Sequence, residues 1–210
     1  MAKIEQIGGG AEKLAVALDE QRVRLFLKNR TQSDRSVQSV FLLQSIASLI
    51  FPDQVPPATG WGRTETKTPY VDVERIPLDA IHRAEQIRKG YAPPDENKDQ
   101  HEVDYYRARY ESIDGHRARF ELGKKLQDAG FALDTSTVNF SHAEGKTRFL
   151  DFGPAWHSYS KSKTVLMFEP RKLKDAIASI TDAARREKAE QHFNELLSIL
   201  PKEVKTSVAL

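Results

Sequence analysis

The spacing of apolar and polar positions predicts a chain that begins with strands. Residues 3–7 alternate between polar and apolar side chains, and residues 14–18 and 22–28 repeat a strand-like pattern after short breaks. Such alternation is typical of half-buried β-strands. We therefore expect three short strands in an antiparallel meander. The glycine turn at residues 8–10 joins the first pair, and the polar turn at residues 19–21 joins the second.

A helix is predicted next. Ser33 or Asp34 can cap a helix that runs to about residue 50, and its apolar residues cover much of its circumference. A helix of this kind is expected to pack on more than one side. Residues 54–69 are rich in proline and glycine and predict a loop with one irregular strand, and residues 70–76 alternate again.

The remainder of the chain has a mainly helical pattern. The predicted helices cover residues 78–89, 102–128 and 170–200, the predicted strands cover residues 138–140 and 148–151, and residues 92–100 form a polar loop. This order predicts an α+β architecture with a small antiparallel sheet. We expect two lobes: a β-rich N-terminal lobe with one helix over residues 1–77 and a reduced helical C-terminal lobe over residues 78–210.

Composition narrows the possible functions. The 210 residues contain 32 Lys and Arg against 30 Asp and Glu, so the chain is nearly neutral and unlike a protein that mainly neutralises a nucleic-acid backbone. With no cysteine, disulfides, thiolate metal sites and cysteine nucleophiles are excluded. No apolar run approaches the roughly 18–20 residues of a membrane span, and no signal peptide is evident. A soluble, cytoplasmic protein is expected.

Two features of the first strands are suited to binding phosphate. Gly8, Gly9 and Gly10 lie between strands, where backbone N–H groups can approach an anion because glycine has no Cβ. Lys28 ends an apolar strand and can reach phosphate oxygens as a point charge. Each feature also has an ordinary explanation, namely a hairpin turn and a solvated lysine.

Two features of the later chain are suited to phosphoryl transfer. Four residues separate Asp134 from Asn139, the spacing by which one loop supplies both a proton acceptor and a metal ligand. Asp151, Phe152 and Gly153 follow the second predicted strand and form the most specific motif of the sequence. The predicted hairpin would bring Asn139 close to Asp151. Their oxygen atoms are the ligands that Mg²⁺ prefers.

In this order, the four features resemble the protein-kinase-like fold. In size and motifs the chain is similar to compact atypical members such as the RIO kinases, the kinase of the tRNA-threonylcarbamoylation complex and the aminoglycoside-phosphotransferase-like enzymes. The resemblance implies that ATP and Mg²⁺ bind between the lobes and that the γ-phosphate passes to an acceptor that the sequence does not identify. The implied nucleotide-binding residues are Gly8, Gly9, Gly10, Lys28, Glu74 and Ile76; the implied catalytic residue is Asp134, acting with Lys28; the implied metal ligands are Asn139 and Asp151.

Several departures from the family pattern leave a pseudokinase as an alternative. The residues before Asp134 lack the His-Arg pair of ordinary protein kinases, and residues 35–50 contain no acidic partner for Lys28. Only 16 residues separate Gly153 from Pro170, too few for a full activation segment. These features favour an interaction or regulatory module that keeps the fold without turnover.

A second alternative is a basic RNA- or partner-binding α+β domain. The basic residues expected on one helical region are Arg107, Arg109, Arg117, Arg119, Lys124 and Lys125, and those of a second cluster are Lys161, Lys163, Arg171, Lys172 and Lys174. Pairs at i,i+4, such as Arg117 with Glu121, also fit a solvated helix face.

Overall fold

The computed structural model describes residues 5–9, 13–28, 32–77, 113–134, 139–160 and 163–205. These residues form three antiparallel sheets and five helices, so the α+β prediction is confirmed. The predicted helix over residues 78–89, the loop over residues 92–100 and the first part of the helix predicted from residue 102 lie outside the described residues.

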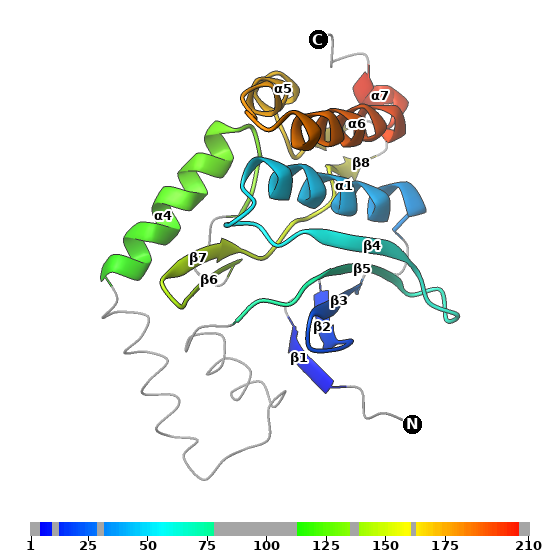
Figure 1. The fold of residues 1–210 in the computed structure, drawn as a ribbon. Coiled ribbons are helices and arrows are strands. Elements are labelled where there is room, and N and C mark those ends of the chain that lie inside the picture. Colours follow the sequence, from blue (N-terminus) through cyan, green and yellow to red (C-terminus); the bar gives the residue numbers. More distant parts are fainter. Residues whose placement is uncertain are drawn as a thin grey trace.

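The largest sheet has five antiparallel strands in the order β1-β2-β3-β5-β4 (Figure 1). Their bounds are β1 (Glu5–Gly9), β2 (Lys13–Ala17), β3 (Arg22–Leu27), β4 (Ala58–Arg63) and β5 (Pro69–Glu74). The predicted meander is therefore correct. Gly8 and Gly9, expected in the turn, instead belong to β1, where they pair with Ala15 and Leu14 next to a register shift. Gly10 lies outside the described residues.

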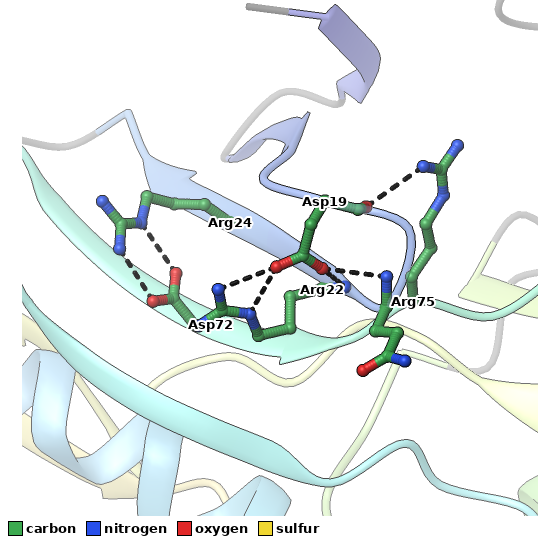
Figure 2. Close-up of polar contacts among 6 residues, drawn as sticks. Asp19, Arg22, Arg24, Asp72 and Arg75 are labelled. Carbon is green, nitrogen blue, oxygen red and sulfur yellow. Dashed lines mark hydrogen bonds and ion pairs between the residues drawn. The ribbon is translucent and has the colours of Figure 1, made fainter.

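An arginine joins β3 to β5 on the outer face of this sheet. Arg24 lies opposite Asp72 and donates two hydrogen bonds to its carboxylate, of 2.7 and 2.8 Å (Figure 2). Its guanidinium carbon also lies 3.7 Å from the centroid of the Tyr70 ring. Two parallel N–H···O bonds and a cation–π contact fix the two strands in register.

Helix α1 (Asp34–Ile50) begins at Ser33, whose hydroxyl accepts a hydrogen bond of 3.2 Å from the Ser36 N–H. It packs against β4 and β5 on one side and against α6 (Ala183–Ile199) on the other (Figure 1). The prediction that this helix packs on more than one side is confirmed. Its two-sided burial explains why apolar residues surround it.

The later chain contains two hairpins and four further described helices. These elements are α4 (Ile113–Asp128), β6 (Phe140–Ala143), β7 (Lys146–Phe149), β8 (Trp156–Ser160), β9 (Lys163–Leu166), α5 (Pro170–Ala178), α6 and α7 (Lys202–Lys205). The β6–β7 hairpin was expected, whereas the β8–β9 hairpin was not. The helix predicted over residues 170–200 is interrupted, because Asp182 caps the start of α6 by accepting from the Arg185 N–H.

One hydrophobic cluster connects both parts of the chain. It extends from Val23 and Leu27 on β3 to Leu196 and Leu200 near the C-terminus. The predicted boundary near residue 77 therefore does not separate two cores among the described residues, and the division into two lobes stays a prediction. No described helix has both the length and the apolar character of a membrane span.

Gly130, at the end of α4, is required by its surroundings. Its φ is +96°, and a Cβ there would lie 2.9 Å from the Glu169 oxygen and 2.9 Å from the Leu173 nitrogen. We expect Gly130→Ala to destabilise the fold by about 1–3 kcal/mol through backbone strain, with a further cost from displacing the start of α5. Gly145→Ala is the matched control, because Gly145 has φ +70° and a Cβ there would meet no atom within 4 Å. Equal unfolding midpoints in urea for the two variants would contradict this expectation.

His192 should make stability depend on pH. Its ring lies edge-on to Phe41 across the contact between α6 and α1, with centroids 6.0 Å apart. Burial, assisted by the charge of Lys188 and opposed by Glu195, lowers the pKa of His192 from its ordinary value of 6.5. The unfolded chain therefore takes up a proton more readily than the fold. The free energy of unfolding should fall as the pH drops from about 6.5 towards the lowered value.

This dependence is measured by urea unfolding at about pH 7.5 and about pH 5.5, on either side of the ordinary histidine pKa. We expect His192→Gln to show a smaller loss of stability between the two conditions than the unchanged protein. Lys188→Gln removes the nearby positive charge that helps to lower this pKa, so it should reduce the loss in part. An unchanged loss in His192→Gln would show that other groups control the dependence.

Candidate functional site

Four buried phenylalanines hold the segments that carry the predicted site. Phe131, Phe140, Phe149 and Phe152 are at most 2% exposed. The Phe152 ring packs edge-on against Phe131 and Phe149, with centroids 5.9 and 5.1 Å apart, and Phe149 packs against Phe140 at 5.0 Å. Aromatic rings in this arrangement gain energy beyond the burial of their area. The cluster thus fixes the ends of the β6–β7 hairpin beside the segment that follows α4.

The hairpin brings Asn139 next to the segment that contains Asp151. Phe140 pairs with Phe149, and the Leu150 N–H donates a hydrogen bond of 2.8 Å to the Asn139 carbonyl. Asp151 follows directly. The predicted convergence of Asn139 with the Asp-Phe-Gly segment is therefore present in the backbone.

The side chain of Asn139 also contacts the predicted catalytic segment. Its Nδ2 donates a hydrogen bond of 2.9 Å to the backbone oxygen of Asp134. Asn139 is 8% exposed, whereas Asp134 is exposed. This hydrogen bond uses the amide nitrogen, and an amide oxygen can accept hydrogen bonds or bind a metal ion independently of it. The residues between them, 135–138, lie outside the described residues.

The cation that contacts Asp151 is Lys13, at the start of β2. Its ammonium forms an ion pair with Asp151 Oδ1 and donates a hydrogen bond of 2.6 Å to the Phe152 carbonyl. The Lys13 side chain is 13% exposed and that of Asp151 is 45% exposed. The sequence pattern did not indicate a role for Lys13. The one signal that could have indicated it is its position three residues after Gly10.

Lys28 lies just beyond the end of β3 and is exposed. It follows Leu27, which is 3% exposed and faces the core. Two glutamines of α1 form hydrogen bonds elsewhere in the protein. Gln38 donates to Glu195 at 2.6 Å, and Gln44 donates to the Pro56 carbonyl at 3.0 Å. The role assigned to Lys28 stays a prediction.

Residues 73–76 are the segment whose backbone groups, by the resemblance to kinases, would meet adenine. This segment uses part of its hydrogen-bonding capacity within the protein. The Glu74 N–H donates to the Pro57 carbonyl at 3.0 Å, and the Arg75 N–H donates to the Gln21 carbonyl at 2.7 Å. The Arg75 side chain also reaches the Asp19 carbonyl at 3.2 Å (Figure 2). A nucleotide base that binds along this segment would therefore have to contact Ile76 or the backbone carbonyl groups.

The β2–β3 turn beside this segment is held by Asp19. Its carboxylate accepts hydrogen bonds from the backbone N–H groups of Gln21 and Arg22 and from the Arg22 side chain (Figure 2). These bonds, led by that from the Arg22 side chain, hold the pKa of Asp19 below its ordinary value. The Gln21 carbonyl of this turn accepts the hydrogen bond from the Arg75 N–H. The turn itself is held by the polar contacts of Asp19.

Asn139 and Asp151 suit a magnesium ion by their chemistry. Mg²⁺ takes oxygen ligands and commonly uses one or two protein groups, with water and phosphate oxygens filling the other positions. The hydrogen bond to Asp134 uses the amide nitrogen of Asn139 and not its oxygen, and the Asp151 carboxylate is partly exposed. Among the described residues there is no group of three or more His, Asp or Glu side chains that could hold a metal.

A hollow of about 660 Å³ lies elsewhere, between the C-terminal end of α1, α4 and the turn of the β6–β7 hairpin. Its described lining includes Gln54, Lys125 and His142 but none of the predicted site residues. Asn139 and Asp151 lie at the open end of the β6–β7 hairpin, whereas this hollow lies beside its turn.

The basic residues of α4 do not form one free basic face. Arg117 pairs with Glu121 at 3.0 Å and Lys124 pairs with Asp128 at 2.6 Å, as expected for a solvated helix surface. Arg119 is buried, at 6% exposure. An RNA or protein partner for this helix is not supported, and Arg107 and Arg109 lie outside the described residues.

Comparisons with known proteins found only distant likeness. No family model and no curated protein sequence matches the chain. Among solved structures, the chain is similar to the GDP and kanamycin complex of the aminoglycoside phosphotransferase APH(2″)-IIIa. The identity is 12%, the TM-score is 0.38, and 94% of this chain and 81% of that chain are covered. The GDP complex of the wild-type aminoglycoside 2′-phosphotransferase-IIIa gives 12% identity and a TM-score of 0.37, covering 94% and 83%. Likeness at this level does not identify a function for this chain.

The contact between Asn139 and Asp134 can be tested by its requirement for a donor. We expect Asn139→Ala to destabilise the fold by about 0.5–1.5 kcal/mol, the net value of one hydrogen bond. Asn139→Asp should cost more at neutral pH, because a carboxylate would face the Asp134 carbonyl oxygen in a nearly buried position. Protonation of that carboxyl restores a donor, so the deficit of Asn139→Asp should shrink as the pH falls. Urea unfolding at two pH values measures this, and a pH-independent deficit would contradict it.

Proposed function

We propose that this protein is a kinase-like phosphotransferase that binds ATP with Mg²⁺ and transfers the γ-phosphate. The observation that carries the proposal is the convergence of Asp134, Asn139, Asp151 and a lysine on one region. Asn139 is hydrogen-bonded to Asp134, the backbone of the next strand joins Asn139 to Leu150, and Lys13 is paired with Asp151. Asp134, Asn139 and Asp151 lie within one short stretch of the chain, whereas Lys13 comes from a segment about 140 residues away.

The residue types suit phosphoryl transfer, which depends on positioning and charge neutralisation more than on covalent participation by the protein. Asn139 and Asp151 would hold the metal ion, which supplies neutralisation of the phosphate charge when bound. Asp134 is exposed and would orient the acceptor hydroxyl and take its proton. Lysine charge and the glycines of β1, together with Gly10, would hold the phosphates.

A nucleotide-binding pseudokinase is the second candidate. Two observations favour it: the Glu74 and Arg75 N–H groups of the predicted adenine segment are bonded within the protein, and α1 has no acidic residue after Asp34. Such a protein would bind nucleotide without transferring phosphate. The two candidates share the site and differ only in turnover.

Thermal unfolding with ATP and Mg²⁺ tests binding, and γ-labelled ATP tests transfer to water, to the protein itself or to added acceptors. We expect stabilisation of about 2.7 kcal/mol when the nucleotide is present at roughly 100 times its dissociation constant. Asp151→Asn should remove the magnesium dependence of this stabilisation. Asp134→Asn should keep nucleotide binding and lose transfer by roughly 100- to 10,000-fold.

The controls separate the candidates. Lys124→Met, on the outer surface of α4, should behave as the unchanged protein in both assays. Stabilisation by magnesium and ATP with no transfer to any acceptor would indicate the pseudokinase. Equal transfer by the unchanged protein, Asp134→Asn and Asp151→Asn would refute the assignment of the site. No response to nucleotide, with a salt-dependent affinity for RNA, would favour a basic binding domain.

A further inference from the structure

Lys13 connects the start of β2 to the segment that contains Asp151. Its ammonium contacts Asp151 Oδ1 and the Phe152 carbonyl, although about 140 residues separate these groups along the chain. Its side chain is 13% exposed, so most of its length is covered. A lysine held in this way has already lost much of the rotamer freedom that a free side chain has.

The register of the sheet explains why Lys13 reaches this point. Lys13 lies directly opposite Leu27 in the pairing of β2 with β3. Directly opposed residues of an antiparallel pair project on the same face, and Leu27 is buried in the core on that face. Lys13 therefore points to the inner side of the sheet, towards the segment that follows β7. Lys28 comes one residue after Leu27, where the alternation of a strand favours the opposite side.

The contacts leave capacity for an anion. An ammonium has three donors, and two of them point at Asp151 and at the Phe152 carbonyl. The Asp151 side chain is 45% exposed, so its carboxylate keeps a surface for another ligand. Lys13 can thus hold a fixed positive charge beside Asp151, which can act as a metal ligand. A magnesium-bound polyphosphate is bound by such a combination, because the ion and the ammonium both neutralise phosphate oxygens.

We infer that Lys13, rather than Lys28, is the lysine that binds the nucleotide phosphates. The inference rests on the proposed function and changes the residue to which this role belongs. Asp151 takes the place of the acidic partner that α1 does not supply, because α1 contains only Asp34, which pairs with Arg63. Asp151 then has two tasks: it positions Lys13 and it contributes an oxygen to the metal ion.

The test compares the affinity of a fluorescent ATP analogue, with Mg²⁺, for the unchanged protein and for Lys13→Met, Lys28→Met and Lys13→Arg. We expect Lys13→Met to weaken binding at least about tenfold, or about 1.4 kcal/mol, and Lys28→Met to weaken it by less than about threefold. Lys13→Arg keeps the charge and should recover part of the affinity. Lys124→Met is the control for the loss of one lysine charge.

Two further measurements separate a phosphate contact from a structural effect. The loss in Lys13→Met should be large for ATP and small for AMP, because only the outer phosphates are expected to meet the ammonium. In the unchanged protein, a lysine-directed acyl-phosphate derivative of ATP should acylate Lys13 in preference to Lys28, as located by peptide mass spectrometry. This second measurement does not depend on the folding of any variant.

The outcomes are distinct. Loss of affinity in Lys28→Met but not in Lys13→Met, or labelling of Lys28 alone, would overturn the inference and leave the proposed function intact. Tighter binding by Lys13→Met would show that Lys13 competes with the metal ion for Asp151, and would also overturn it. If the unchanged protein binds neither ATP nor AMP, the proposed function itself fails.

Discussion

The site depends on the cluster formed by Phe131, Phe140, Phe149 and Phe152. Their rings are almost fully buried, and they come from three segments: the end of α4, the β6–β7 hairpin and the stretch after it. A polar group at such a site can hold its position only if the backbone beneath it is fixed, and dense packing of aromatic rings supplies that rigidity. Asn139 precedes one of these rings and Asp151 precedes another. The polar residues therefore owe their proximity to the apolar residues next to them.

The polar contacts connect this rigid base to the sheet. Lys13 on β2 contacts Asp151 and the Phe152 carbonyl, and Ser39 on α1 accepts a hydrogen bond of 3.0 Å from the Ala155 N–H. The segment after β7 is thereby attached to both the sheet and the helix. An ion pair with partial exposure contributes little stability by itself, so the contact of Lys13 is better understood as positioning charge than as holding the fold together.

Local patterns predicted much of the fold, because strand alternation and the Ser33 cap are encoded in neighbouring residues. The meander, α1 and the β6–β7 hairpin follow from such patterns. The β8–β9 hairpin was missed because its first strand follows Gly153 and Pro154 and carries serine and histidine between its aromatic residues. In the site, the hairpin spacing predicted the approach of Asn139 to the Asp151 segment. The contact of Lys13 could not be predicted, because it depends on strand register and on packing between segments about 140 residues apart.

The two-sided burial of α1 accounts for the unusual placement of charge. Helix α6 packs on the side of α1 that faces away from the sheet. Three polar side chains of α1 contact neighbouring segments: Gln38 with Glu195, Gln44 with the Pro56 carbonyl and Ser39 with the Ala155 N–H. An unpaired acidic side chain in such a helix would carry a heavy desolvation cost. A helix buried on both sides therefore disfavours acidic residues. This is consistent with the absence from α1, after Asp34, of a carboxylate that could pair with a lysine at the end of β3. The partly exposed Asp151 carboxylate bears a smaller cost, and a lysine on β2 lies within its reach.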